Sequence, residues 1–242
     1  MFDIVCSGLK KVFQSGDRTS RPLDDLTVTI PAGEITAVIG ESGCGKTTFL
    51  RMIASLDKPN EGTLSFIDKD QNRQSPKVAV VFQEPRLFAW LTVRENIAMA
   101  IRHLPKDEQN EKVDKVLDLV RLTKASDLYP RELSGGMAQR VGLARALVAS
   151  PDILLLDEAF SALDALTRQK LYQEFIRIHK ECPMTTVLVT HDVMEAVLLS
   201  RHIHYFASGK VKASFEVPFD YPRSLSTPGC SELCDRILEE FF

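Results

Sequence analysis

The sequence predicts an α/β fold with a mostly parallel sheet, and three observations support this. Four short segments, AVIG, VAVVF, ILLLD and TVLVT, are apolar almost throughout, as expected for strands buried on both faces of a parallel sheet. Strand-like and helix-like segments alternate over much of the chain. A glycine-rich loop, GESGCGKTT at residues 40–48, separates a strand-like segment from a helix-like one.

The first third of the chain consists mainly of strand-like segments. Within these segments, apolar residues either alternate with polar ones or follow one another, and PAG at 31–33 provides a turn between two of the segments. A helix-like segment, KTTFLRMIASL (46–56), begins at Lys46, within the last three residues of the glycine loop. The strands expected here are FDIVCSGLKKVF (2–13), LDDLTVTI (23–30), EITAVIG (34–40), GTLSFID (62–68) and KVAVVFQ (77–83).

Residues from about 90 to 150 are expected to form a helical insertion. VRENIAMAI (93–101) is helix-like, NEKVDKVLDLVRL (110–122) has apolar residues at the spacing of one helix face, and LSGG (133–136) opens a helix with a similar stripe. The two stripes are Val113, Val116, Leu117 and Val120, and Met137, Val141, Ala144 and Val148.

After Pro151 the alternation of strands and helices returns, and a proline-rich tail follows from residue 218. The tail ends in a short amphipathic segment, SELCDRILEEFF (231–242), in which Cys234 would share a helix face with the preceding Cys230. The other expected elements are strand DILLLD (152–157), helix 165–181, strand TTVLVT (185–190), helix 192–200, and strands HIHYFA (202–207) and KVKASFEV (210–217).

The composition is that of an ordinary globular protein. Of the 242 residues, 44% are hydrophobic and 26% are charged, and the formal net charge is −3, which gives no basic excess for binding nucleic acid. No apolar run approaches the ~18 residues that span a bilayer. The odd number of cysteines, five, has no disulfide-like spacing and indicates a reducing compartment.

The glycine loop has the pattern Gly40-x4-Gly45-Lys46-Thr47 between a strand and a helix. Glycines let the backbone wrap closely around a phosphate chain, with the amides pointing inward. Lys46 would supply positive charge to the β- and γ-phosphates, and the Thr47 hydroxyl would bind Mg²⁺. The loop therefore predicts a nucleoside triphosphate site.

Two acids follow the apolar strand ILLLD and are expected at the carboxyl edge of the parallel sheet, where ligands bind in such folds. Asp157 is the expected Mg²⁺ partner. Glu158 is the expected base, because a carboxylate beside the γ-phosphate can polarise the attacking water.

Gln83 and His191 each follow an apolar strand. We expect both strands to lie beside the strand of the glycine loop, so that Gln83 contacts Mg²⁺ or the water and His191 contacts the γ-phosphate. By contrast, His202 and His204 share one face of a strand without a third ligand, and we expect them to be surface or packing residues.

The LSGG segment predicts a second anion site. Ser134, Gly135 and Gly136 would present a hydroxyl and backbone amides at a helix N-terminus. Because this helix belongs to the insertion, far from Lys46, the phosphate it meets would be bound to another copy of the chain. A two-fold dimer in which each LSGG covers the nucleotide of its partner satisfies both observations.

Together these motifs resemble the ATPase subunit of ATP-binding cassette (ABC) transporters, over about residues 2–215. Six motifs occur in the family's order: Phe13 as the aromatic that stacks on adenine, GESGCGKT, Gln83, LSGG, ILLLDE with SALD (161–164), and His191. QEPRLFAWLTVRENI (83–97) and DEAFSALDALTR (157–168) resemble the branch that serves nitrate, sulfonate and taurine importers.

The resemblance implies a P-loop core with an N-terminal antiparallel β subdomain. It also implies an ATPase domain over 1–217, with a helical subdomain at about 90–150, and a C-terminal tail over 218–242. The catalytic residues would be Lys46, Gln83, Glu158 and His191, and the Mg²⁺ ligands Thr47, Gln83 and Asp157. The residues that would bind ATP are Phe13, Gly40, Glu41, Ser42, Gly43, Cys44, Gly45, Lys46, Thr47, Thr48, Ser134, Gly135 and Gly136.

The resemblance also implies the partners of this ATPase. It would be peripheral at the cytoplasmic face of the cell membrane and would contact an integral membrane permease through the segment from Arg86 to Trp90. Leu87, Phe88 and Trp90 are apolar or aromatic in an expected exposed loop, which suits an interface. An extracytoplasmic binding protein would deliver the substrate, and no nucleic acid would be involved.

Three alternatives remain. An ABC exporter or lipid-extraction ATPase would use the same motor, although the segment 83–97 favours import. A soluble cassette ATPase acting on ribosomes or DNA usually has two cassettes, coiled-coil insertions or basic tracts, and this chain has none. A small-molecule P-loop kinase would leave LSGG and His191 unexplained.

Overall fold

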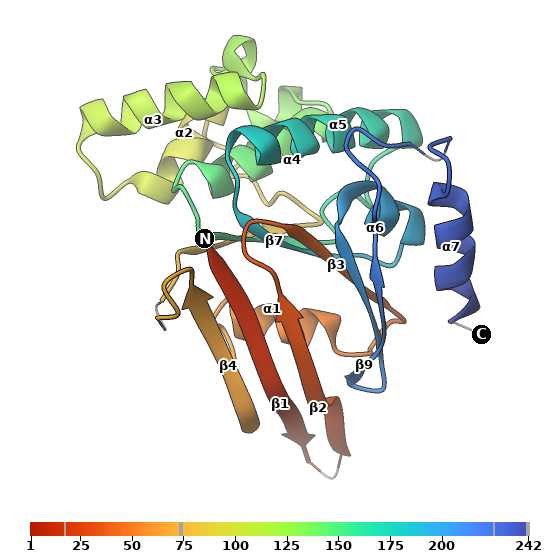
Figure 1. Cartoon of the computed structure of the whole chain (residues 1–242). Coiled ribbons are helices and arrows are strands. Elements are labelled where there is room, and N and C mark those ends of the chain that lie inside the picture. The colour runs from red at the N-terminus through yellow and green to blue at the C-terminus, as the bar shows by residue number, and fades with distance from the viewer. Residues whose placement is uncertain (17, 73–74, 225, 241–242) are drawn as a thin grey trace.

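The computed structural model describes residues 1–16, 18–72, 75–224 and 226–240, which contain two β-sheets (Figure 1). A three-stranded antiparallel sheet has the order β2-β1-β4, and a six-stranded sheet has the order β5-β6-β7-β3-β8-β9. The strands from β5 to β8 in that order are parallel, and only the edge strand β9 is antiparallel. The predicted α/β class with a mostly parallel sheet and an N-terminal antiparallel β unit is therefore confirmed.

The strands are β1 (Phe2–Ser15), β2 (Arg18–Ile30), β3 (Ile35–Gly40), β4 (Glu61–Asp68), β5 (Val78–Phe82), β6 (Ile153–Asp157), β7 (Thr185–Val189), β8 (His202–Ala207) and β9 (Lys210–Glu216). The α-helices are α1 (Lys46–Ile53), α2 (Val93–Ala98), α3 (Lys106–Leu119), α4 (Gly135–Leu147), α5 (Ala165–Glu181), α6 (Val193–Leu199) and α7 (Cys230–Glu239). Short 3₁₀ turns lie at Met99–Ile101, Thr123–Ala125 and Pro130–Glu132.

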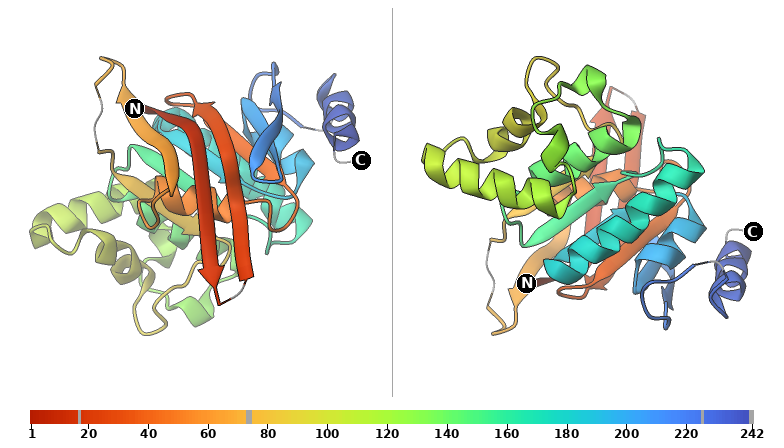
Figure 2. Two further views of the ribbon diagram at one scale, coloured as in Figure 1. Left: turned by 90° about the horizontal axis from the view of Figure 1, so that it is seen from below. Right: turned by 90° about the horizontal axis from the view of Figure 1, so that it is seen from above.

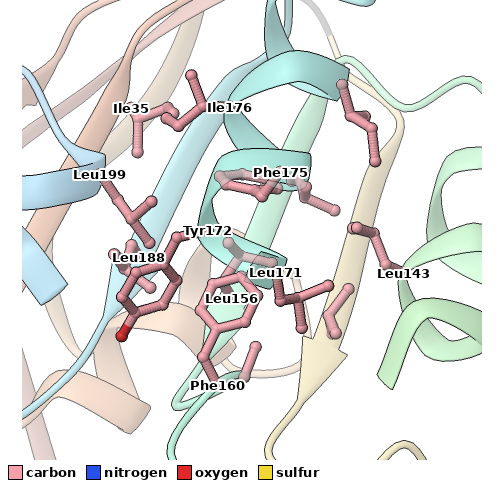
Figure 3. Close-up of a cluster of buried hydrophobic side chains, with 14 of the residues drawn as sticks. Ile35, Leu143, Leu156, Phe160, Leu171, Tyr172, Phe175, Ile176, Leu188 and Leu199 are labelled. Atoms are coloured by element: carbon pink, nitrogen blue, oxygen red, sulfur yellow. The ribbon is translucent and has the colours of Figure 1, made fainter. Parts of the chain in front are cut away.

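The six-stranded sheet separates two hydrophobic cores. Alternate side chains of β6 point to opposite faces, so Ile153 and Leu155 join one core while Leu154 and Leu156 join the other. The first core contains α1 and the inner face of the antiparallel sheet, which places α1 between the two sheets (Figure 1). Helix α5 covers the second core, and the aromatic rings of its Tyr172 and Phe175 pack on the sheet around Leu156 (Figure 3). Burial on both faces explains why these strands are apolar almost throughout.

The helices from α2 to α4 lie to one side of α5, above the sheet (Figure 2). Their apolar stripes join the second core; Val113, Leu117 and Val141 have 1% or less of their surface exposed. A buried carboxylate connects this group to α5, because Glu174 of α5 lies 2.8 Å from the guanidinium of Arg140 in α4. The helical insertion is thus fixed to the core by apolar packing and by an ion pair between the buried Glu174 and the partly exposed Arg140.

One expectation about the sheet was wrong. We expected the strands before Gln83 and His191 both to lie beside the strand of the glycine loop, β3. Only β7, before His191, is its neighbour, whereas β5, before Gln83, lies at the sheet edge with β6 and β7 between. Parallel strands are joined by crossover connections, so their order along the chain does not fix their order in the sheet.

The tail folds back onto the core. Helix α7 packs against α6, with Cys230 and Cys234 on its buried face together with Leu233 and Ile237 (Figure 1). The two cysteines share a helix face as predicted. Among the described residues, no three or more histidine, cysteine or acidic side chains are grouped to hold a metal ion. No helix in the described part of the chain is long and apolar enough to cross a membrane.

His202 and His204 make structural contacts, as expected. His202 Nε2 lies 2.6 Å from Glu34 Oε2, and His204 Nδ1 lies 2.8 Å from the Ser214 hydroxyl across the β8–β9 pair. Burial, with the nearby His202, lowers the pKa of His204 to about 4.

Candidate nucleotide-binding site

A cavity of about 420 Å³ lies at the carboxyl edge of the parallel sheet, around the start of α1. It collects residues from four separate parts of the chain: the β1–β2 hairpin, the glycine loop, and the ends of β6 and β7. Its lining residues are Phe13, Ser20, Pro22, Ser42, Gly43, Gly45, Lys46, Thr47, Thr48, Glu158 and His191.

The glycine loop requires glycine at two of its tightest points. Gly40 and Gly45 have φ angles of 151° and 108°. A Cβ on Gly40 would lie 2.3 Å from the carbonyl oxygen of Phe206, and one on Gly45 would lie 2.2 Å from that of Pro22. A larger residue at either position would push the loop away from β8 or β2 and change its shape.

The loop ends in a helix N-terminus suited to an anion. Within the described residues, α1 has no side-chain cap on its N-terminus and no acid in its first turn. Lys46 is only 8% exposed, and its Nζ donates to the carbonyl oxygens of Gly40 (2.7 Å) and Glu41 (2.8 Å). The helix amides and the ammonium group together provide positive potential for a phosphate chain.

Asp157 and Glu158 face this positive charge from the end of β6. Burial, together with the charge of Glu158, raises the pKa of Asp157, while Lys46 acts to lower it. The side chain of Glu158 is 32% exposed, and its Oε1 lies 3.5 Å from His191 Nδ1. A partly exposed carboxylate beside a histidine can accept a proton from water that enters the cavity.

The backbone at Glu158 is unusual for a residue with a side chain, since its φ is 49°. Its N–H donates to the carbonyl oxygen of Val189 (3.0 Å). Its carbonyl oxygen accepts from both the backbone N–H of Ser161 (3.1 Å) and the Ser161 hydroxyl (2.9 Å). Such conformations persist only where surrounding contacts hold them, and they cluster at functional sites.

The β1–β2 hairpin brings an aromatic ring to the phosphate loop. Phe13 is 42% exposed, and the Lys11 ammonium lies 5.0 Å from the centre of its ring. Sequence analysis missed Ser20 and Pro22, which also line the cavity. Ser20 pairs with Phe13 across the hairpin, so only the strand register, which no local motif encodes, could have identified it.

Several of the expected residues do not line this cavity: Gly40, Glu41 and Cys44 of the glycine loop, Asp157, Gln83, and residues 134–136. Gln83 is exposed after the edge strand β5. Residues 134–136 lie at the start of α4, where the Ser134 hydroxyl caps the helix by accepting from the N–H of Met137 (3.3 Å). A Cβ on Gly136 would lie 2.6 Å from the Thr167 side chain, so this glycine also has a packing role within its own chain.

The loop after Gln83 is exposed but firmly held. Trp90 is 73% exposed, and its ring centre lies 5.4 Å from that of Phe88. Arg145 of α4 donates to the carbonyl oxygens of Pro85 (2.5 Å) and Arg86 (3.1 Å). The fully buried side chain of Asn96 holds the rest of the loop through hydrogen bonds to backbone groups of Phe88 and Leu91.

These anchors were not identified from the sequence. Arg145, Gln139 and Asn96 are isolated polar residues in helices, and only the tertiary structure brings them to the loop. The side-chain amide of Gln139 donates to the carbonyl of Phe82 (3.1 Å). The helix that begins at LSGG is therefore tied at two points to the segment from Phe82 to Arg86.

The chain matches the family model described as "ABC transporter" over residues 23–161. It is 42% identical to the aliphatic sulfonates import ATP-binding protein of Bacillus licheniformis, covering 96% of this chain and 91% of the relative. It is 46% identical to the nitrate import ATP-binding protein of Synechocystis, covering 83% of this chain but 31% of that protein. With the bicarbonate transport ATP-binding protein of Synechococcus elongatus it shares 44% identity, covering 91% of this chain and 34% of that protein.

Among solved structures, the chain resembles an ATP-binding cassette determined as a dimer in a post-hydrolysis state with ADP and Pi. The TM-score is 0.76 at 29% sequence identity, and the match covers 90% of this chain and all of that one.

Proposed function

The chain belongs to the ABC transporter family, and from this premise we propose that it is the ATP-hydrolysing motor of an importer for a small anion. ATP hydrolysis is the activity of this family, and the similar proteins are ATP-binding subunits of import systems. The observation that carries the proposal is the cavity that unites the phosphate loop, Phe13, Glu158 and His191.

Each group in the cavity has a role in this proposal. Phe13 stacks on the adenine ring, while the amides of the loop and the Lys46 ammonium hold the phosphates. Glu158 accepts a proton from the attacking water, and His191 contacts the γ-phosphate. Catalysis in this arrangement comes mostly from positioning and charge neutralisation, since water is the acceptor.

We include Mg²⁺ in the proposal because the donor set fits it. The Thr47 hydroxyl and the Asp157 carboxylate are hard oxygen ligands, which Mg²⁺ prefers, and they are too few to hold it without phosphate oxygens. Mg²⁺ would neutralise charge on the β- and γ-phosphates. Gln83 is a further proposed ligand, and both Gln83 and Asp157 lie outside the cavity lining in this structure.

A dimer is supported by the similar cassette, which was solved as a dimer. Ser134, Gly135 and Gly136 do not line the cavity of their own chain, so their proposed ligand is the γ-phosphate on the partner copy. ATP binding would then close the dimer, and hydrolysis would reopen it.

The membrane permease is the second partner in the proposal. The exposed Trp90, with Phe88 beside it, forms an aromatic surface on a loop that α4 holds in place. Arg145 and Gln139 would pass the movement of the LSGG helix to this surface. The ATPase would then act at the cytoplasmic face of the membrane, with an extracytoplasmic protein supplying the substrate.

The cargo is proposed from the relatives, which are ATP-binding proteins named for the import of aliphatic sulfonates or nitrate and for the transport of bicarbonate. All of these are small anions. An exporter with the same motor is the second candidate, and the experiment below separates the two.

The test is a capture experiment with the Glu158→Gln variant. This variant should bind ATP and form a stable dimer while losing turnover, and with ATP it should co-purify with a multi-span permease from solubilised membranes. Glu111→Gln, the same change at an exposed site on α3, is the control and should retain turnover. Retained turnover in the Glu158→Gln variant would remove the base role, and recovery of soluble partners alone would overturn the transport function. Recovery of a permease without an associated binding protein would favour the exporter.

A further inference from the structure

A second cavity, of about 780 Å³, lies between α5, α6 and the tail residues 221–224 and 226, and we call it the tail cavity. It shares no lining residue with the nucleotide cavity and is of a size that holds small organic ligands. Its lining includes Ala165 and Arg168 from the segment DEAFSALDALTR (157–168), but none of the residues expected to bind nucleotide.

The buried side-chain atoms of the tail cavity lining that have no hydrogen-bond partner, within the described part of the chain, are N–H donors. Arg223 lines this cavity and donates through Nη1 to the carbonyl oxygens of Val197 (2.7 Å) and Ser200 (2.9 Å), at the end of α6. Its Nε and Nη2 are buried and have no hydrogen-bond partner within the described part of the chain, and the same holds for Nε of the lining residue Arg168. Buried N–H groups of this kind are normally paired.

The acids of the tail cavity are already satisfied. Glu195 accepts from the Tyr172 hydroxyl (2.9 Å), and burial raises the pKa of this carboxyl. Asp192 caps α6 by accepting from the N–H of Met194 (2.9 Å), and it lies 3.5 Å from Arg168. The unsatisfied groups therefore call for an acceptor on the ligand rather than a donor.

The remaining walls are largely apolar. Ile176, Leu198 and Leu199 line the cavity, and the Tyr221 ring lies under Arg223, 4.1 Å from its guanidinium carbon. Figure 3 shows Ile176, Tyr172 and Leu199 together on the α5 side of the core. A ligand with both an acid group and a short apolar body would match both kinds of surface.

We propose that the tail cavity binds a small organic anion, a carboxylate or sulfonate with a short apolar body. Its acid oxygens accept from the N–H groups of Arg168 and Arg223, which are buried in this structure and turn toward the ligand when it binds, and its body packs on the side chains of Ile176 and Leu198.

Such a ligand would also act on the nucleotide site, a step that rests on the proposed function. Arg168 Nη2 donates to the carbonyl of Leu163 (2.8 Å), five residues after Glu158, and Arg168 Nη1 faces Asp192, which directly follows His191. An anion that draws the Arg168 guanidinium toward itself weakens both contacts. ATP hydrolysis therefore falls when the tail cavity is filled.

The test is isothermal titration calorimetry of the full chain with 1-hexanesulfonate, hexanoate and hexylamine, in the presence of saturating ADP. ADP occupies the phosphate loop, so the added anions cannot bind there. Both anions should bind with one site per chain, and hexylamine should not bind. Arg223→Gln and Gln173→Trp should each weaken binding about tenfold or more, the first by removing charged donors and the second by filling the cavity mouth. Lys170→Gln, which removes a charge from α5 outside the cavity, should bind as the wild type does.

Each other result of the calorimetry overturns the proposed binding site. The proposed site is overturned if neither anion binds at concentrations up to tens of millimolar, or if ADP abolishes the binding. It is also overturned if Lys170→Gln weakens binding as much as Arg223→Gln and Gln173→Trp do. Gln173 is exposed, so its variant keeps the test valid even if the Arg223 variant does not fold. The ATPase rate is measured separately. A chain with no ATPase activity would refute the proposed function and leave the site intact, whereas ATPase unchanged by a bound anion would refute the coupling alone.

Discussion

Replacing the buried Asn96 with alanine should release the exposed loop that we propose as the permease contact. Asn96 Oδ1 accepts from the N–H of Phe88 (2.8 Å), and its Nδ2 donates to the carbonyl oxygens of Phe88 (3.2 Å), Leu91 (3.0 Å) and Thr92 (2.9 Å). The side chain has no exposed surface, so these bonds do not compete with water. They fix the ends of the loop to the start of α2.

The size of the effect follows from these contacts. An amide NH₂ has two hydrogens, so the three Nδ2 contacts share them, and the side chain contributes about three hydrogen bonds in total. At about 1 kcal/mol each, Asn96→Ala should lower the free energy of unfolding by about 3 kcal/mol. Nucleotide binding should remain, because Asn96 does not line the cavity around Lys46, but capture of the permease should be lost.

Urea denaturation measures the stability change, and co-purification from membranes measures permease capture. Asn110→Ala, at an exposed position of α3, is the control and should change stability by less than about 0.5 kcal/mol. Asn96→Asp keeps the acceptor for Phe88 but turns a second oxygen toward the three carbonyls, so it should be at least as damaging as Asn96→Ala. A loss below about 1 kcal/mol for Asn96→Ala, or a milder effect of Asn96→Asp, would refute this reasoning.

Three further predictions concern other parts of the molecule. Phe13→Ala should weaken ATP binding about fivefold by removing a stacking partner, whereas Phe13→Trp should not, as measured by titration with a fluorescent ATP analogue. Glu174→Ala should lower the free energy of unfolding by about 3 kcal/mol in urea, because it leaves Arg140 without its buried carboxylate; Glu174→Gln should lose less, since its amide oxygen still accepts. His204 has a pKa lowered from 6.5 to about 4, so its neutral form stabilises the fold above pH 6.5 and this contribution is lost as the pH falls toward 4. Between about pH 7 and pH 5 the wild type should therefore lose up to about 2 kcal/mol more stability than His204→Gln does.

Each of these predictions has a clear contrary result. Equal ATP affinity of the Phe13→Ala variant and the wild type would place adenine elsewhere. Equal losses for the alanine and glutamine variants of Glu174 would show that the amide oxygen does not replace the carboxylate and that its negative charge accounts for the whole effect. Parallel pH profiles for the wild type and His204→Gln would mean that His204 titrates normally in the folded state.

Much of the fold and of the candidate site could be predicted from the sequence, because the signals are local. The phosphate loop is contained within nine consecutive residues, and its strand–loop–helix context is continuous with it. Hydrophobic periodicity is also local, and the helix expected at 165–181 begins and ends at those residues in the structure. Asp157 and Glu158 could be placed at the sheet edge because parallel strands end on the same side.

Only the tertiary structure decided which of these parts meet. The order of strands in the sheet puts His191 beside the phosphate loop and Gln83 at a distant edge, and the hairpin register brings Phe13 and Ser20 into the cavity. The tail cavity and the burial of Asn96 also result from the packing of separate elements against one another. Such contacts join residues that are far apart along the chain, and they depend on how the layers pack. A hydrophobic pattern specifies which face of an element is buried, but not which element covers it.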